Sequence, residues 1–323
     1  MENQTKKISY LEIFKQAFKL TWKNRYLWWF GLFIALSGIL TSFNYSFEGD
    51  QNNQLMRQNA QNFLLSHPAL IIAGLIVFIV IIALFIIIGI LGRGALIGSL
   101  GEITADKTAN FKIGMRFGRK YFWKIFFINL LLGIFTGALM MILATPIIFL
   151  FYAKSFVIGT LLGIIALLIF VPILFLTAFL RIFGYLYIVL GKLPLWLSLE
   201  NAYNLLTKNI KSAIIFCLLF IPITILLGFF AILLLIPVGI VFLIIGLIMF
   251  FLFREVGAVI ILTIAIAFAA ILFLAIKSVY EVFAQAVWLL YFREIAKPEE
   301  PEKIAEEEKE VEVIPKTTPI ENI

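Results

Sequence analysis

The sequence has one cysteine, Cys217, and one histidine, His67, among its 323 residues. These two residues exclude a disulfide within the chain and cannot form a Cys/His metal cluster. No Ser/His/Asp set, paired carboxylates or nucleotide-binding loop is present either, so neither a cofactor nor an enzymatic activity is expected. Charged residues make up 14% of the chain and hydrophobic residues 63%. Soluble domains hold about 45–50% apolar residues, so an ordinary water-soluble fold is excluded.

Long uncharged apolar runs recur along the chain and predict an all-α, polytopic transmembrane helix bundle of about six spans. About 20 apolar residues cross a hydrocarbon core of about 30 Å as a helix. The expected spans are 26–43, 68–92, 125–152, 156–181, 212–253, and a last one that starts at 256 and ends between 276 and 291.

The run 212–253 holds 42 residues without a charge, which is about 63 Å as one straight helix. A single span does not absorb that length. Two alternatives stay open: one span followed by a short membrane-embedded piece after a break at Pro222 or Pro237, or two short spans around Pro237. The second alternative gives seven spans and moves the C-terminal tail to the other side of the membrane.

Basic residues are distributed unequally between the two sides of a six-span chain. One side holds 23 of the 26 bases, and the other holds only Arg57, Lys154 and Arg254. The positive-inside rule then predicts a multi-pass protein of the cytoplasmic (inner) membrane with both termini in the cytoplasm. The first apolar run follows a 25-residue leader and is expected to be a retained span rather than a signal peptide.

The sequence divides into an integral membrane domain, 1–297, and an acidic tail, 298–323. The tail has nine acids, three lysines and no aromatic residue. Such a segment cannot bury enough apolar surface to fold alone, and it predicts a disordered cytoplasmic tail. The tail is a candidate docking segment for a cytoplasmic protein, and a plain solubilising extension is the alternative.

Three related segments begin near residues 9, 110 and 194, each ahead of an apolar run. In each one a small residue is followed after three positions by an apolar or aromatic residue and after three more by a lysine, which is Lys23, Lys124 or Lys208. Ser9 and Glu12 form a capping-box pattern. The segments predict three amphipathic elbow helices that lie in the interface and turn into the next span. The alternative is a chance alignment of basic, aromatic segments.

These elbow segments, together with the closing segment 283–293, resemble a broad bacterial family of uncharacterised multi-pass membrane proteins. It is the integral membrane domain sometimes fused to glycerophosphoryl diester phosphodiesterases. The resemblance covers nearly the whole chain up to Arg293. It implies a six-span module with a role connected to lipids. No part of the chain is long or polar enough to be the hydrolase domain, so the resemblance does not imply phosphodiesterase activity.

Pairs of glycines four residues apart occur in three of the expected spans. Small residues at this spacing let helices approach closely in lipid. The pairs are therefore expected to pack spans within one chain, and the alternative is that one of them forms a dimer face. They are Gly94 and Gly98, Gly133 and Gly137, and Gly159 and Gly163.

Three charged residues are candidate site residues. Lys277 and Glu281 are four apart and share a helix face. With a bilayer over 256–276 they are snorkelling groups at the boundary. With a bilayer over 268–291 they are intramembrane ions, each costing about 3 kcal/mol near the centre. Arg181, at the end of the fourth span, is either an interfacial anchor or a ligand for a lipid phosphate.

The leading hypothesis is a non-enzymatic membrane scaffold or lipid-interacting module whose partners are membrane lipids, anionic ones included, and not nucleic acid. A transporter is the main alternative, supported by helix breaks expected at Pro146, Pro222 and Pro237 and by the repeats. A membrane-embedded lipid-modifying enzyme is the second alternative, with Glu281 and Arg181 as its only candidate groups.

Overall fold

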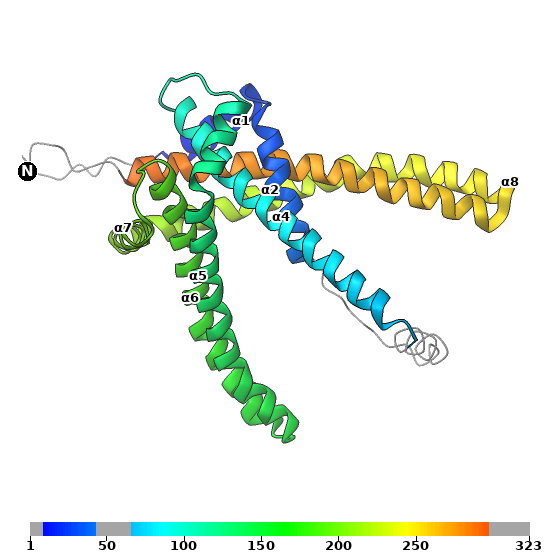
Figure 1. The fold of residues 1–323 in the computed structure, drawn as a ribbon, viewed down its shortest axis with the longest axis horizontal. Coiled ribbons are helices and arrows are strands. Elements are labelled where there is room, and N and C mark those ends of the chain that lie inside the picture. Colours follow the sequence, from blue (N-terminus) through cyan, green and yellow to red (C-terminus); the bar gives the residue numbers. More distant parts are fainter. Residues whose placement is uncertain (1–8, 43–65, 297–323) are drawn as a thin grey trace, which may run out of the picture.

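The computed structural model describes residues 9–42 and 66–296, and all regular structure in these ranges is helical (Figure 1). This confirms the predicted all-α class. The acidic tail lies outside the described residues. In chain order the helices are α1 (Tyr10–Lys23), α2 (Leu27–Ser42), α4 (Pro68–Ile103), α5 (Phe111–Tyr152), α6 (Phe156–Val189), α7 (Leu195–Lys208) and α8 (Ile210–Ile295).

Within the described ranges, five helical segments are long and apolar enough to cross a membrane. They are α4, α5, α6 and the two limbs of α8, Ile210–Gly257 and Val259–Ile295. The first predicted span corresponds to α2, whose apolar stretch Leu27–Gly38 is shorter than the other five. Five long segments and one shorter apolar helix agree with the prediction of about six spans.

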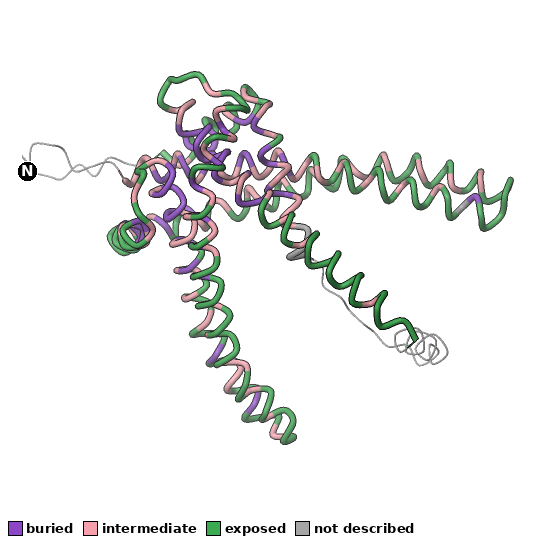
Figure 2. Tube along the Cα trace, in the orientation of Figure 1, coloured by how far each residue is buried: buried purple, intermediate pink, exposed green. Residues whose placement is uncertain are grey.

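The long helices converge at one end and diverge at the other (Figure 1). We call the convergent part, which contains α1, α7 and the adjoining ends of the long helices, the core end. Three arms leave it: the N-terminal half of α4, the α5–α6 hairpin and the α8 hairpin. Figure 2 shows that the buried residues gather at the core end, whereas the arms are largely exposed.

The arms expose large apolar side chains along most of their length, for example Val157 at 84% and Phe251 at 78%. An apolar surface of this extent is not stable in water. The backbone polar groups of an α-helix are satisfied within the helix, so a helix can place such a surface in lipid. The arms are therefore the membrane-spanning part of the molecule.

The structure of α8 excludes both alternatives predicted for the run 212–253. Pro222 and Pro237 both lie inside one continuous helix, and the only non-helical backbone in α8 is at Arg254, with φ 53° and ψ −139°. The run is therefore neither two short spans nor a span with a separate embedded piece. The chain instead reverses at Arg254 and returns antiparallel, so the seven-span alternative is wrong.

The length of this run is explained by its first part, which lies in the protein core rather than in an arm. Ala213 and Phe216 are fully buried, and the ring of Phe216 stacks on Phe14 of α1 at 5.8 Å between centroids. The remainder, from about residue 227 to 253, is about 40 Å long at 1.5 Å per residue. That length suits one span with some tilt.

Two of the three predicted elbow helices exist as separate elements, α1 and α7, and both end at an asparagine. The side-chain amides of Asn24 and Asn209 each donate to the carbonyl four residues earlier, on Leu20 and Leu205, at 3.0 Å. At both asparagines the backbone leaves the helical region, with φ −114° and ψ 65° at Asn24 and φ −118° and ψ 25° at Asn209. In the middle copy Ile125 stands at this position and is buried, and α5 continues without a break to Tyr152. The prediction of a separate middle elbow is wrong.

Two further details of α1 differ from prediction. Ser9 makes no side-chain capping bond, so the predicted capping box is absent. The apolar side of α1, with Ile13, Phe14 and Ala17, is buried against the protein core rather than directed into lipid. The helix still exposes Phe18 and Trp22 on another side.

The glycine pairs divide into two groups. A Cβ on Gly94 would lie 3.1 Å from the Cα of Gly118, and a Cβ on Gly98 would lie 2.3 Å from the ring of Phe117, so this pair packs α4 on α5 as predicted. A Cβ on Gly133, Gly137 or Gly163 would meet no described atom within 4 Å, and one on Gly159 would make only ordinary contacts with residues 150 and 151. The prediction of tight packing within the chain is wrong for these two pairs.

Candidate functional site at the base of the arms

A cluster of polar side chains lies where the arms meet the core end. It contains one residue from each long helix, and each is 23 to 25 residues from the distal end of its helix, which is about 35–38 Å. These residues and their distal ends are Arg93 and Pro68 in α4, Asn129 and Tyr152 in α5, Arg181 and Phe156 in α6, and Lys277 and Arg254 in α8.

Tyr185, which is buried on α6, connects two members of the cluster. Its hydroxyl donates a short hydrogen bond to the side-chain oxygen of Asn129. The same hydroxyl accepts a long bond of 3.5 Å from Nη1 of Arg93, whose guanidinium carbon lies 5.9 Å from the centre of the tyrosine ring. The Asn129 amide donates to the carbonyl of Ile125 at 3.0 Å. The network orients Arg93 at the junction of α4, α5 and α6.

Glu281 and Lys277 share a face of α8, as their spacing predicts. Glu281 interacts electrostatically with Lys277 and also with Arg93, which the sequence did not place beside it. It forms no direct ion pair with either base within the described residues. The Nζ of Lys277 lies against α2, since a Cβ on Gly38 would be 3.0 Å from it. Glu281 is thus one carboxylate that lies beside two bases, Lys277 and Arg93.

Arg181 lies near Tyr185 rather than beside Glu281. Its charge acts on Tyr185 together with that of Arg93. The Nε atom of Arg181 is buried and has no hydrogen-bond partner within the described residues. A buried donor without a partner is costly, at about 1–3 kcal/mol and more for a charged group. The predicted trio is therefore not one compact site, and Arg93 and Tyr185 are the residues that connect its two parts.

Arg93 was recognisable in the sequence only as a base among glycines, because its partners come from other helices. The nearest is Tyr185, 92 residues away along the chain. Neither residue belongs to a local motif. Spacing along the sequence could have revealed the cluster, because α4, α5, α6 and α8 each have a polar residue 23 to 25 residues from the distal end of the helix.

The elbow lysines have separate surroundings. Nζ of Lys124 donates to the carbonyl of Leu193 at 3.1 Å, which ties α5 to the loop before α7. A shallow apolar groove of about 330 Å³ lies beside this contact and is lined by Phe127, Leu131 and Trp196 among others. Lys23 and Lys208 are exposed in the last turns of α1 and α7.

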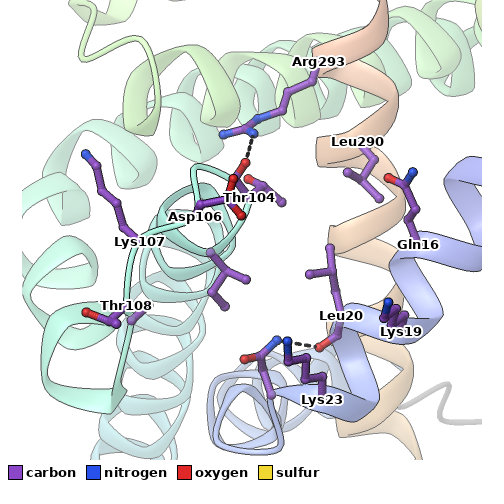
Figure 3. A pocket seen from close by; sticks show the side chains of 13 residues that line it. Gln16, Lys19, Leu20, Lys23, Thr104, Asp106, Lys107, Thr108, Leu290 and Arg293 are labelled. Carbon is purple, nitrogen blue, oxygen red and sulfur yellow. Dashed lines mark hydrogen bonds between the residues drawn. The ribbon is translucent and has the colours of Figure 1, made fainter.

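A second, basic pocket of about 770 Å³ lies between α1, the α4–α5 loop and the end of α8 (Figure 3). Arg293 on its wall donates to the carbonyls of Thr104 at 2.8 Å and Gly101 at 3.1 Å, which satisfies the C-terminal end of α4. Within the described lining there are four bases and one acid: Lys19, Lys23, Lys107, Arg293 and Asp106. No cluster of metal-ligating side chains occurs in 9–42 and 66–296.

The helical arms, their exposed apolar surface and the polar cluster at their base define the class: the chain is a multi-pass helical membrane protein. No protein-family model, curated protein or solved structure matches the chain. The resemblance to the phosphodiesterase-associated membrane domain family stays a prediction.

Proposed function

We propose that the protein is a non-enzymatic, lipid-binding membrane protein that holds the headgroup of an anionic phospholipid at the base of its arms. The observation that carries the proposal is the position of Arg93 between two other bases: Arg93 neighbours Tyr185, on which Arg181 also acts, and Glu281, on which Lys277 also acts. An excess of two positive charges in partly buried surroundings favours an anion. Guanidinium groups hold phosphate oxygens in a bidentate fork.

The depth of the cluster supports a headgroup as the ligand. In an arm that runs along the bilayer normal, a hydrocarbon core of about 30 Å leaves a residue about 35–38 Å from the distal end just beyond the core boundary. The proposal takes the first of the two depths predicted for Lys277 and Glu281, at the membrane boundary. Trp22, Trp123 and Trp196 are exposed at the core end, and tryptophan is enriched at membrane–water interfaces.

The transporter alternative loses one of its two arguments. Pro146, Pro222 and Pro237 all lie inside continuous helices, so the broken spans expected at these prolines are absent. The lipid-enzyme alternative required Glu281 and Arg181 to act together, whereas the neighbours of Glu281 are Arg93 and Lys277. The lipid-binding proposal needs neither a broken helix nor that pair.

Native mass spectrometry of the gently solubilised protein tests the proposal. We expect the wild type to retain an anionic phospholipid, and Arg181→Gln and Arg93→Gln each to reduce its occupancy about tenfold, because one charge-assisted hydrogen bond contributes about 1.5–3 kcal/mol. Arg254→Gln removes an arginine at the distal turn and serves as the matched control, with unchanged occupancy. Equal retention in all four proteins contradicts the proposal.

A further inference from the structure

The basic pocket is separate from the cluster that carries the proposed function, and it differs from it in exposure. Lys19, Lys23 and Lys107 are exposed, and Arg293 is held on the wall by its two carbonyl partners. Lys107 also lies 3.7 Å from Glu102. Figure 3 shows the side chains of α1 and of the α4–α5 loop on opposite sides of the opening, with Arg293 above them. The pocket therefore offers several ammonium groups to an anionic ligand that enters from outside.

The shape of the pocket favours an extended ligand with several charges. Lys19 and Lys23 are one helical turn apart on α1, and Lys107 stands across the pocket from them. A volume of about 770 Å³ is at the upper end of the range for small-molecule sites of about 300–1,000 Å³. Exposed lysines gain little from one isolated charge, but a segment with many carboxylates can contact several of them together.

The chain itself has such a segment next to the pocket. Leu290 and Arg293 line the pocket, and α8 ends at Ile295 beside it. Glu299 and Glu302 follow within seven residues of that end, and seven extended residues reach up to about 25 Å. From residue 298 on, nine acids face three lysines. We propose that the acidic segment 299–312 binds in the basic pocket of the same chain.

Tethering makes this segment a strong competitor for the pocket. A short flexible linker gives an effective concentration in the millimolar range, so weak individual charge pairs are enough to populate the contact. The segment then neutralises Lys19 and Lys23 of α1, which line the pocket. This inference does not rest on the lipid site at the base of the arms.

Zero-length carbodiimide coupling of carboxylates to amines, read by mass spectrometry on the full chain, tests the contact. We expect Lys19, Lys23 and Lys107 to couple to glutamates of 299–312. The double variant Lys19→Gln/Lys23→Gln is expected to reduce coupling at Lys107 about threefold to tenfold, as expected when exposed charge pairs of up to about 1 kcal/mol are lost. Lys154→Gln, at the distal α5–α6 turn, is the control and leaves the coupling unchanged.

Two results overturn the inference. The first is that Lys107 does not couple to the tail in the wild type, or that it couples to the same extent in the double variant as in the wild type. The other comes from mixing isotopically light and heavy chains: if the coupled peptides are mixed in statistical proportion, the segment binds a neighbouring copy and not its own chain. Unmixed peptides support binding within one chain. The same experiment is done on wild-type protein reconstituted in nanodiscs. If anionic lipid occupies the pocket there and the tail does not couple, the pocket is a headgroup site and the proposal that the tail binds in it is rejected.

Discussion

At the scale of single residues, the close contacts of this protein depend on glycines that face another helix. A Cβ on Gly31 of α2 would lie 2.1 Å from the backbone oxygen of Ser278 and 2.9 Å from Cγ2 of Val282 in α8. The hydroxyl of Ser278 in turn donates to the carbonyl of Trp28. The two backbones are thus held together at a distance that only glycine allows.

Gly31→Ala is expected to lower the free energy of unfolding by about 1–3 kcal/mol, because the added methyl group meets backbone that cannot move freely. Thermal denaturation in detergent, followed by circular dichroism or dye binding, measures the change. Gly137→Ala is the matched control: a Cβ there would meet no described atom within 4 Å, and alanine is the better helix former by up to about 1 kcal/mol. Equal destabilisation by both substitutions contradicts the packing argument.

The hydroxyl of Tyr185 is a second group on which the site depends. Tyr185→Phe removes the group that joins Asn129 to Arg93. We expect a loss of about 1–3 kcal/mol of stability, since polar groups remain without their partner in a buried place, and a weaker retention of anionic lipid. Tyr152→Phe, on an exposed distal residue, controls for the loss of a hydroxyl. An unaltered melting temperature in Tyr185→Phe contradicts the role assigned to the network.

At this scale the sequence located individual charges but not their neighbours. Lys277 and Glu281 share a face because four residues make about one helical turn, and this could be read directly. The pairing of Arg93 with Tyr185 depends on how α4 crosses α6, and no short-range pattern encodes that crossing. For the same reason the basic pocket, which joins α1 to the end of α8, was not predicted.

At the scale of the elements, two of the three elbow copies end at the same position, one residue after the shared lysine. Asn24 and Asn209 bond back to the carbonyls of Leu20 and Leu205, and the backbone leaves the helical region at both residues. The corresponding Ile125 has no polar group and is buried, so α5 continues. The repeat was visible in the sequence because its columns match. The matching columns did not show which copies end; the position after the shared lysine is asparagine in the two copies that end and Ile125 in the copy that continues.

The reversal of α8 at Arg254 is the other decisive feature of an element. Its φ of 53° with ψ of −139° lies in a region that costs a residue other than glycine about 1–3 kcal/mol. Arg254→Gly is therefore expected to raise stability by about 1 kcal/mol in thermal denaturation. Arg119→Gly, within the exposed side of α5, should lower it by about as much. A lower melting temperature for Arg254→Gly would falsify this account of the turn.

The prolines misled the prediction for the same run. Proline in a helix removes one hydrogen bond and bends the helix. In lipid that cost is reduced by neighbouring groups and small local adjustments, so the helix persists. Pro222 and Pro237 therefore lie within α8, and the chain turns at a charged residue instead.

At the scale of the whole molecule, a six-span arrangement, with α2 counted as a span, predicts the side of the membrane on which each end lies. Lys154 and Arg254 occupy the turns at the far ends of two arms, and Lys19 lies at the core end. In a Cys217→Ser background, cysteines at 154 and 254 are expected to react with a membrane-impermeant maleimide in intact bacterial cells. A cysteine at 19 is expected to react only after permeabilisation. Labelling of 154 and 254 from opposite sides would reject the topology.

The distal turns also determine how the chain can enter a membrane during synthesis. The α5–α6 turn has Lys154 as its one charge, and the α8 turn has Arg254 beside the opposite charge of Glu255. Moving one such charge through the bilayer centre costs about 3 kcal/mol, whereas two long apolar helices that cross with it offset that cost many times over. Each hairpin can therefore insert as a unit, with its turn leading and the two other helix ends staying on the side of entry. The core end is complete only when every hairpin is in place, because the long helices that meet there come from all of them.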